Sequence, residues 1–217
     1  MRLFHLLCIF ISLGLAVSSL MVGWKQTFTA ESGLVELAGL MVFALGAVLS
    51  VAWMPKGALG KWWPIPVVFV LFCLRELDFH NAFFTPGVLQ TRIFTSPVPL
   101  WQKAVSAAAM SGILLTLVLL MVRGTRPLLS GLWRRQGWAW SIVAGVTFAV
   151  ASVLVDGADR QLAAIGVALP HAESAIWTAI EEILELGFAL SLIFAICRWH
   201  DRAAHSAAPS ASFVSQA

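Results

Sequence analysis

Six long apolar segments that carry few charges are the feature of this sequence that most constrains its fold. They cover residues 3–22, 33–54, 64–84, 103–122, 137–155 and 174–199. Each is close to the roughly 20 residues that a helix needs to cross the hydrocarbon of a bilayer. Charged residues make up 12% of the 217 residues, against about 25% in soluble domains. The chain is therefore predicted to be a polytopic membrane protein.

The predicted fold class is all-α, a polytopic membrane helical bundle of about six transmembrane helices. Backbone amides and carbonyls in lipid must be paired within the protein, and a helix pairs them within its own segment. Residues 1–202 are expected to form this transmembrane domain. Residues 203–217, rich in Ala and Ser, are expected to be a disordered cytoplasmic tail because they cannot build a core.

The positive residues beside the segments predict the orientation, because loops rich in Lys and Arg stay in the cytoplasm. One side would carry most of the 14 Lys and Arg residues, namely Arg2, Lys56, Lys61, Arg123, Arg126, Arg134, Arg135, Arg198 and Arg202. The other side would carry Lys25, Arg92, Lys103 and Arg160. Both termini are thus predicted to be cytoplasmic (N-in/C-in). The chain resembles small multi-span proteins of bacterial inner membranes in general style, and the bacterial inner (cytoplasmic) membrane is its predicted location.

Composition also narrows the partners. The net charge of +3 is small and its cations gather beside the membrane segments, so no nucleic-acid partner is expected. The lipid bilayer is the expected partner, together with a lipid or small-molecule ligand, while the oligomeric state is not readable.

Cys8, Cys73 and Cys197 fall in separate segments without a CxxC pair, which argues against disulfides and zinc-thiolate sites. Residues 3–22 exceed the roughly 7–15 apolar residues of a signal peptide and are expected to be a retained span.

Most acidic residues lie on the predicted outer side. These are Glu31, Glu36, Glu76, Asp78, Asp156, Asp159, Glu173, Glu181, Glu182 and Glu185. A carboxylate at the centre of a spanning helix costs about 2.5–3.5 kcal/mol. From the helix rise, Glu76 lies about 18 Å and Glu185 about 21 Å from the inner edge of a hydrocarbon layer about 30 Å thick. Acids from separate segments are therefore predicted to converge in a polar site that opens to the periplasmic side.

The run Arg-Glu-Leu-Asp-Phe-His at residues 75–80 is the densest polar motif. Glu76 and His80 are four residues apart, so on a helix they share one face. Arg75 and Asp78 would share another face and pair locally as supporting residues. The functional interpretation is that Glu76 and His80 belong to a metal or proton site. The alternative is a structural network of salt bridges and hydrogen bonds at a helix end.

The sixth segment carries three glutamates. Glu181 and Glu185 share a helix face, and Glu182 neighbours Glu185. Like charges at such spacings repel, so a proton or a bound cation is expected between them. The structural alternative is that Arg75 pairs with one glutamate while the others are protonated. Near the second segment, Glu36 is a stronger site candidate than Glu31, because Glu36 lies inside the apolar segment. About 27 Å of helix separates Glu36 from the inner edge.

The excess of acidic residues favours a bound proton or cation that neutralises them. The potential negative groups outnumber Arg75 and His80, and protons, water or a cation must balance the rest. The candidate catalytic residues are Glu76, His80, Glu181 and Glu185. The candidate metal ligands are Glu36, Glu76, His80, Glu181, Glu182 and Glu185. Carboxylates with one imidazole suit Zn, Mn or Fe, so the expected cofactor is a divalent metal cation.

Three functions remain open from the sequence. The first is a cation-dependent membrane enzyme that acts at the outer leaflet on a lipid or lipid-linked group. The second is an ion- or proton-coupled transporter, which the apolar inner halves of the segments disfavour. The third is a scaffold or accessory subunit in which the acids fix helix packing. Two outer loops could cover the site: residues 85–100, expected to be irregular, and residues 156–171, with a surface helix at 161–168.

Overall fold

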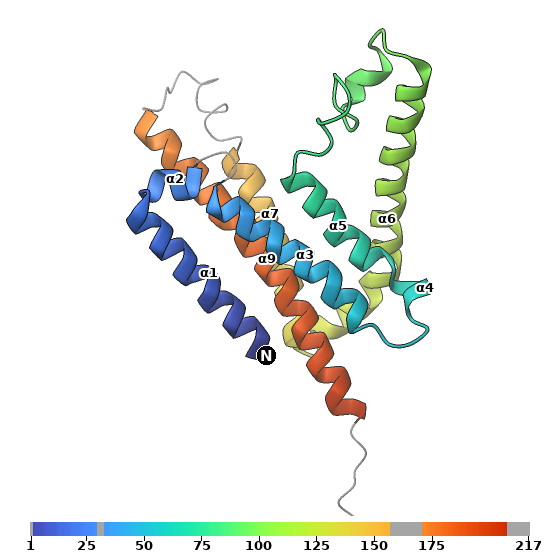
Figure 1. Ribbon diagram of the computed structural model, residues 1–217. Coiled ribbons are helices and arrows are strands. Elements are labelled where there is room, and N and C mark those ends of the chain that lie inside the picture. Colours follow the sequence, from blue (N-terminus) through green and yellow to red (C-terminus); the bar gives the residue numbers. More distant parts are fainter. Residues whose placement is uncertain (1, 30–32, 157–170, 208–217) are drawn as a thin grey trace, which may run out of the picture. The chain divides into compact units, whose positions relative to one another are not determined.

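The computed structural model describes residues 2–29, 33–156 and 171–207 (Figure 1). Within these ranges the chain forms helices and no strands, which confirms the predicted all-α class. The predicted surface helix at 161–168 lies outside the described residues. The elements are α1 Arg2–Met21, α2 Trp24–Thr29, α3 Leu34–Ala52, α4 Leu59–Trp62, α5 Pro64–Glu76, the 3-10 helix η1 Thr91–Phe94, α6 Leu100–Trp133, α7 Gly137–Asp156 and α9 His171–Ala207.

Four helices of the described chain are long and apolar enough to cross a membrane. They are α1, α3, α6 and α7. This finding agrees with a membrane protein of the helical type. The count of about six spans stays a prediction, because α5 has 13 residues and covers about 20 Å, while the 37-residue α9 carries the three glutamates.

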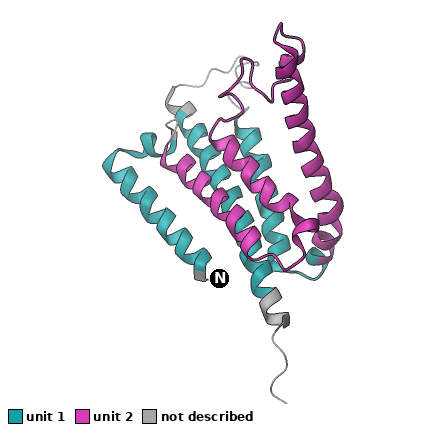
Figure 2. Cartoon of the chain, turned by 45° about the vertical axis from the view of Figure 1, so that its right-hand side comes forward, with its two compact units in different colours: residues 1–30, 131–217 teal, residues 31–130 magenta. Residues whose placement is uncertain are grey.

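The chain divides into two compact units, shown in different colours in Figure 2. One unit comprises residues 1–30 and 131–217, and the other comprises residues 31–130. Each unit has its own packed pair of helices: α7 with α9 in the first, and α3 with α5 in the second.

The 31–130 unit is built on α3 and α5, which run antiparallel. Phe43 of α3 is 2% exposed. Its ring centroid lies 6.4 Å from that of Phe69 and 5.0 Å from that of Phe72, both on α5. Gly46, one turn further along α3, gives the Phe69 ring its space, since a Cβ at Gly46 would overlap that ring. The pair is therefore held by aromatic rings packed against a small residue.

The other unit is built on α7 and α9, which also run antiparallel. Two glycines bring the helices close together. A Cβ at Gly145 of α7 would lie 3.3 Å from the Cβ of Ser191, and a Cβ at Gly187 of α9 would lie 3.3 Å from the ring of Phe148. Small residues at such crossings are typical of helix packing in membranes, where close van der Waals contact replaces the hydrophobic effect as the driving force.

The helices α1 and α2 form a corner in the same unit. Gly23 turns the chain with a φ of +93°, a backbone conformation that glycine adopts readily. The Ser18 and Thr27 hydroxyl oxygens are 2.9 Å apart and share a hydrogen bond, and Thr27 also donates to the carbonyl of Gly23 at 3.0 Å. Thr27 is 1% exposed, so these bonds satisfy a buried hydroxyl at the corner.

Three helix boundaries differ from those predicted. The segment predicted to be helical over 64–84 leaves the helix after Glu76, because Asp78 adopts a φ of +49°, a left-handed conformation that Asp tolerates better than most residues. The segment predicted at 103–122 continues to Trp133, through charged residues and Pro127. Helix α9 extends to Ala207, past the predicted start of the tail. Residues 208–217 lie outside the described ranges, so the disordered tail stays a prediction.

Candidate functional site

Glu36 and Glu76 lie at the same end of the antiparallel α3/α5 pair. Glu36 is in the first turn of α3, Glu76 is the last residue of α5, and both side chains are partly buried. Gly39 is buried three residues beyond Glu36, so the two share a face of α3. A Cβ at Gly39 would lie 3.9 Å from the Oε2 atom of Glu76. The Glu76 carboxylate therefore reaches across to α3, one turn from Glu36.

The two helix ends act differently on these two acids. The N-terminus of α3 carries the positive end of the helix dipole, which stabilises a carboxylate such as Glu36. The C-terminus of α5 carries the negative end, which disfavours the ionised form of Glu76. Arg75 stands in the same last turn of α5.

Asp78 and His80 lie in the turn that follows α5. The helix ends before them, with Leu77 as its cap. The Nδ1 atom of His80 is 3.8 Å from Oδ1 of Asp78, so the two form an ion pair when His80 is protonated. The prediction that Glu76 and His80 share a helix face is therefore wrong, because His80 is not on the helix. The prediction that Arg75 and Asp78 share a helix face is also wrong, because Asp78 lies beyond the end of α5.

In the other unit, Glu185 of α9 is hydrogen-bonded to α7. The hydroxyl of Ser152, which is 3% exposed, donates to Oε1 of Glu185 at 3.3 Å. Glu181 and Glu182 precede Glu185 on the same continuous helix and are partly buried. The spacing of the three glutamates along one helix is thus as predicted.

The candidate residues are divided between the two units. Glu36, Glu76, Asp78 and His80 belong to residues 31–130, and the three glutamates of α9 belong to the other unit. Their convergence into one site stays a prediction. Within the described ranges, no three His, Cys, Asp or Glu side chains lie together in a way that could hold a metal ion. The six-ligand metal set also stays a prediction.

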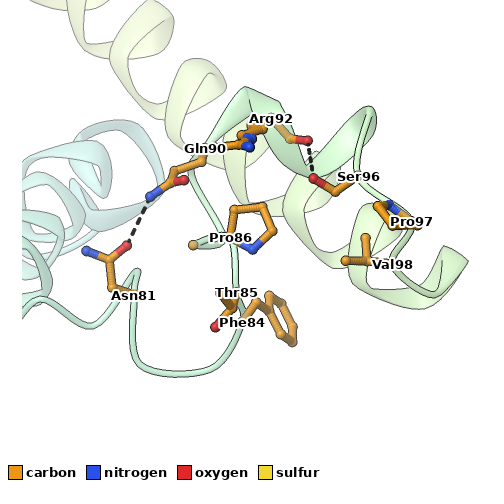
Figure 3. A pocket seen from close by; sticks show the side chains of 10 residues that line it. Asn81, Phe84, Thr85, Pro86, Gln90, Arg92, Ser96, Pro97 and Val98 are labelled. Atoms are coloured by element: carbon orange, nitrogen blue, oxygen red, sulfur yellow. Dashed lines mark hydrogen bonds between the residues drawn. The ribbon is translucent and has the colours of Figure 1, made fainter.

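A pocket in the loop between α5 and α6 was not predicted (Figure 3). Its volume is about 590 Å³. In it, the side-chain amide of Gln90 donates to Oδ1 of Asn81 at 3.5 Å, and the hydroxyl of Ser96 donates to the carbonyl of Arg92 at 2.9 Å. The lining residues are Asn81, Phe84, Thr85, Pro86, Gly87, Gln90, Arg92, Ser96, Pro97 and Val98.

The sequence contains one signal for this pocket. Residues 85–100 are predicted to be an irregular loop, and long loops between regular elements often carry function. The sequence does not indicate which loop side chains meet, because that depends on how the loop folds. Arg92 and Gln90 therefore do not stand out before the structure is known.

Comparison with known proteins assigns no family. No family model matches the chain, and neither a curated protein nor a solved structure matches it. The functional argument therefore rests on the chemistry of the chain's own residues.

Proposed function

We propose that the chain is a multi-pass protein of the bacterial inner membrane with a carboxylate site that opens to the periplasmic side. The site binds a cation and serves a reaction on a lipid or lipid-linked group at the outer leaflet. Ionisable residues within membrane segments are costly and commonly mark ion pathways or reaction sites. The four membrane-length helices and the acids in α3, α5 and α9 support this reading.

One observation carries the proposal: the Glu76 carboxylate lies against α3, one turn from Glu36. Two carboxylates at one end of a helix pair repel each other, and the dipole of α5 adds to the cost at Glu76. A cation between them would remove both penalties. In this proposal the two carboxylates hold the cation and water completes its shell, since Glu36 and Glu76 provide two ligands and a closed protein site needs more.

Such a site would supply defined chemistry. A bound cation polarises a phosphoryl or carbonyl oxygen of a headgroup and stabilises the charge that develops in the transition state. The acids bind the cation, and His80, in the turn beside them, is a candidate for proton transfer. The catalytic role predicted for Glu181 and Glu185 stays a prediction.

The proposal is tested by cation-dependent stability. Purified protein in detergent is heated with increasing Mn²⁺ or Zn²⁺, and the midpoint of unfolding is measured. A cation at about 100 times its Kd adds roughly 2.7 kcal/mol of stability. The variants Glu36→Gln and Glu76→Gln keep the side-chain shape but remove the charge, so each is expected to lose this gain. Asp201→Asn, near the end of α9 predicted to face the cytoplasm, is the matched control and should keep it.

Two results would contradict the cation site. One is a wild-type protein that no cation stabilises. The other is a stabilisation that both Gln variants retain in full. The metal content of wild type and of His80→Ala, both purified without added metal, is then compared. This comparison distinguishes a site that includes His80 from one built on the two glutamates alone.

A structural role for the acids is the second candidate, and the Ser152–Glu185 bond favours it for Glu185. This bond joins α7 to α9 inside their packed interface. In a scaffold, Glu185→Gln would lower the unfolding midpoint without changing any response to cations or any turnover. In the proposed enzyme, Glu76→Gln would abolish the cation response while the unfolding midpoint without added cation stayed near that of wild type.

A further inference from the structure

The pocket in the α5–α6 loop has the chemistry of an anion site. Of its ten lining residues, all of them described, Arg92 is the one that carries a charge. The amides of Asn81 and Gln90 bond to each other, Asn81 also donates to Asp78 at 3.5 Å, and the hydroxyls of Thr85 and Ser96 complete the polar lining. A guanidinium presents a planar fork of donors that matches two oxygens of a phosphate. Figure 3 shows the side chains of Arg92, Gln90 and Pro86 among those that line the pocket.

The loop that forms the pocket is held in shape from several sides. The Lys103 ammonium of α6 donates to the carbonyl of Phe94 at 3.1 Å, and the amide of Val88 donates to the carbonyl of His80 at 2.7 Å. Ile93 of η1 is fully buried. A binding site whose backbone is already ordered loses less entropy when a ligand binds.

The pocket also lies next to a membrane-length helix. Helix α6, which is long and apolar enough to cross a bilayer, begins at Leu100, directly after the last lining residues. Trp101 in its first turn is 58% exposed, and its ring centroid lies 5.3 Å from that of Phe84, a lining residue. Tryptophans gather at the level of the lipid headgroups. This tryptophan at the start of α6 supports a place for the pocket at the level of the headgroups.

We infer that this pocket binds a phosphate group, with Arg92 as its main ligand. The phosphate belongs either to a phospholipid or lipid-linked headgroup or to free phosphate. This inference rests on the proposed function for the membrane face and deepens it, because it assigns the part of the chain that would hold the headgroup of the substrate. The carboxylate site and the phosphate pocket are separate in residues, so they can fail separately.

Calorimetric titration of purified full-length protein tests the inference. The probes are short-chain dihexanoyl-phosphatidylglycerol and inorganic phosphate, each added at constant ionic strength. Arg92→Gln is expected to weaken binding by roughly ten-fold or more, the size of a lost hydrogen bond to a charged group. Arg92→Lys keeps the charge without the planar fork and should lose part of the affinity. Lys25→Gln makes the same charge change on the same predicted membrane face, outside the pocket, and should bind as wild type.

The two probes distinguish the sources of the phosphate. Binding of phosphatidylglycerol without competition by phosphate indicates a headgroup, and binding of phosphate that displaces the lipid indicates the free ion. The inference is overturned if wild type binds neither probe, if Arg92→Gln binds as wild type, or if Lys25→Gln loses as much affinity. If Arg92→Gln does not fold, as judged by circular dichroism and gel filtration, Arg92→Lys decides in its place. Glu76→Gln should keep phosphate binding, so a failed cation site leaves this result intact.

Discussion

The hydroxyl of Ser152 provides a hydrogen bond to a carboxylate, Glu185, between two packed helices. A buried carboxylate without partners costs several kcal/mol. The bond from Ser152 joins a hydroxyl to the carboxylate of Glu185, and hydrogen bonds to charged groups contribute about 1.5–3 kcal/mol. This bond also links α7 to α9. The same contact therefore reduces the cost of the acid and fixes the register of the two helices.

Ser152→Ala is expected to lower the stability of the protein by about 1.5–3 kcal/mol, because it removes the donor and leaves Glu185 without that bond. Ser141 provides a matched control on the same helix. It is also buried, at 7% exposed against 3% for Ser152, but its hydroxyl donates to the carbonyl of Gly137 in its own helix at 2.7 Å. The check is the unfolding midpoint in detergent. Equal losses in Ser152→Ala and Ser141→Ala would argue that the bond to Glu185 adds nothing specific.

Among the helices, the end of α5 at Glu76 has the largest consequence for the candidate sites. Thirteen residues cover about 20 Å, less than the roughly 30 Å of hydrocarbon. The turn at Asp78 and the pocket that follows therefore place polar groups beyond the last turn of a short helix.

Packing between α3 and α5 gives a prediction at the same scale. Gly46→Ala is expected to destabilise the protein by about 1–3 kcal/mol, as overpacking does, because the new Cβ would overlap the buried ring of Phe69. Gly112→Ala in α6 is the control: a Cβ there meets nothing within 4 Å. Because alanine favours the helix over glycine by roughly 0.5–1 kcal/mol, the control should be neutral or slightly stabilising. Unfolding midpoints of the two variants provide the measurement, and a Gly46→Ala protein as stable as wild type would disprove the close packing.

For the whole molecule, the predicted orientation determines which membrane face carries the candidate sites. The larger set of positive flanks predicts that both termini are cytoplasmic. The acids at the end of the α3/α5 pair and the pocket after α5 would then face the periplasm. A reversed orientation would move the proposed reaction to the other leaflet and would leave the local geometry unchanged.

Cysteine labelling of intact cells checks this orientation. The three native cysteines are replaced by alanine, and single cysteines are introduced at Thr91, in the pocket loop, and at Ser130, near the end of α6. A membrane-impermeant maleimide should label position 91 in intact cells and position 130 after the membrane is opened. The opposite pattern would reverse the predicted topology. Equal labelling of both positions in permeabilised cells is the control for accessibility.

The all-α membrane class follows from the amino-acid sequence, as do the places of α1, α3 and α7 within two residues at each end. The sequence also places three glutamates on one helix, α9. These properties depend on apolar length, helix period and the need to pair backbone groups in lipid, and all three can be read along the chain.

The folded structure was needed to find where α5 ends and that His80 leaves the helix. It was also needed to find that Glu76 lies against Gly39 and that Ser152 bonds to Glu185. It also decided which loop residues meet around the pocket. Each depends on the conformation of one turn or on contacts between residues far apart in the chain. A hydrophobicity pattern has no information about such contacts, because many side-chain pairings share the same pattern of apolar residues.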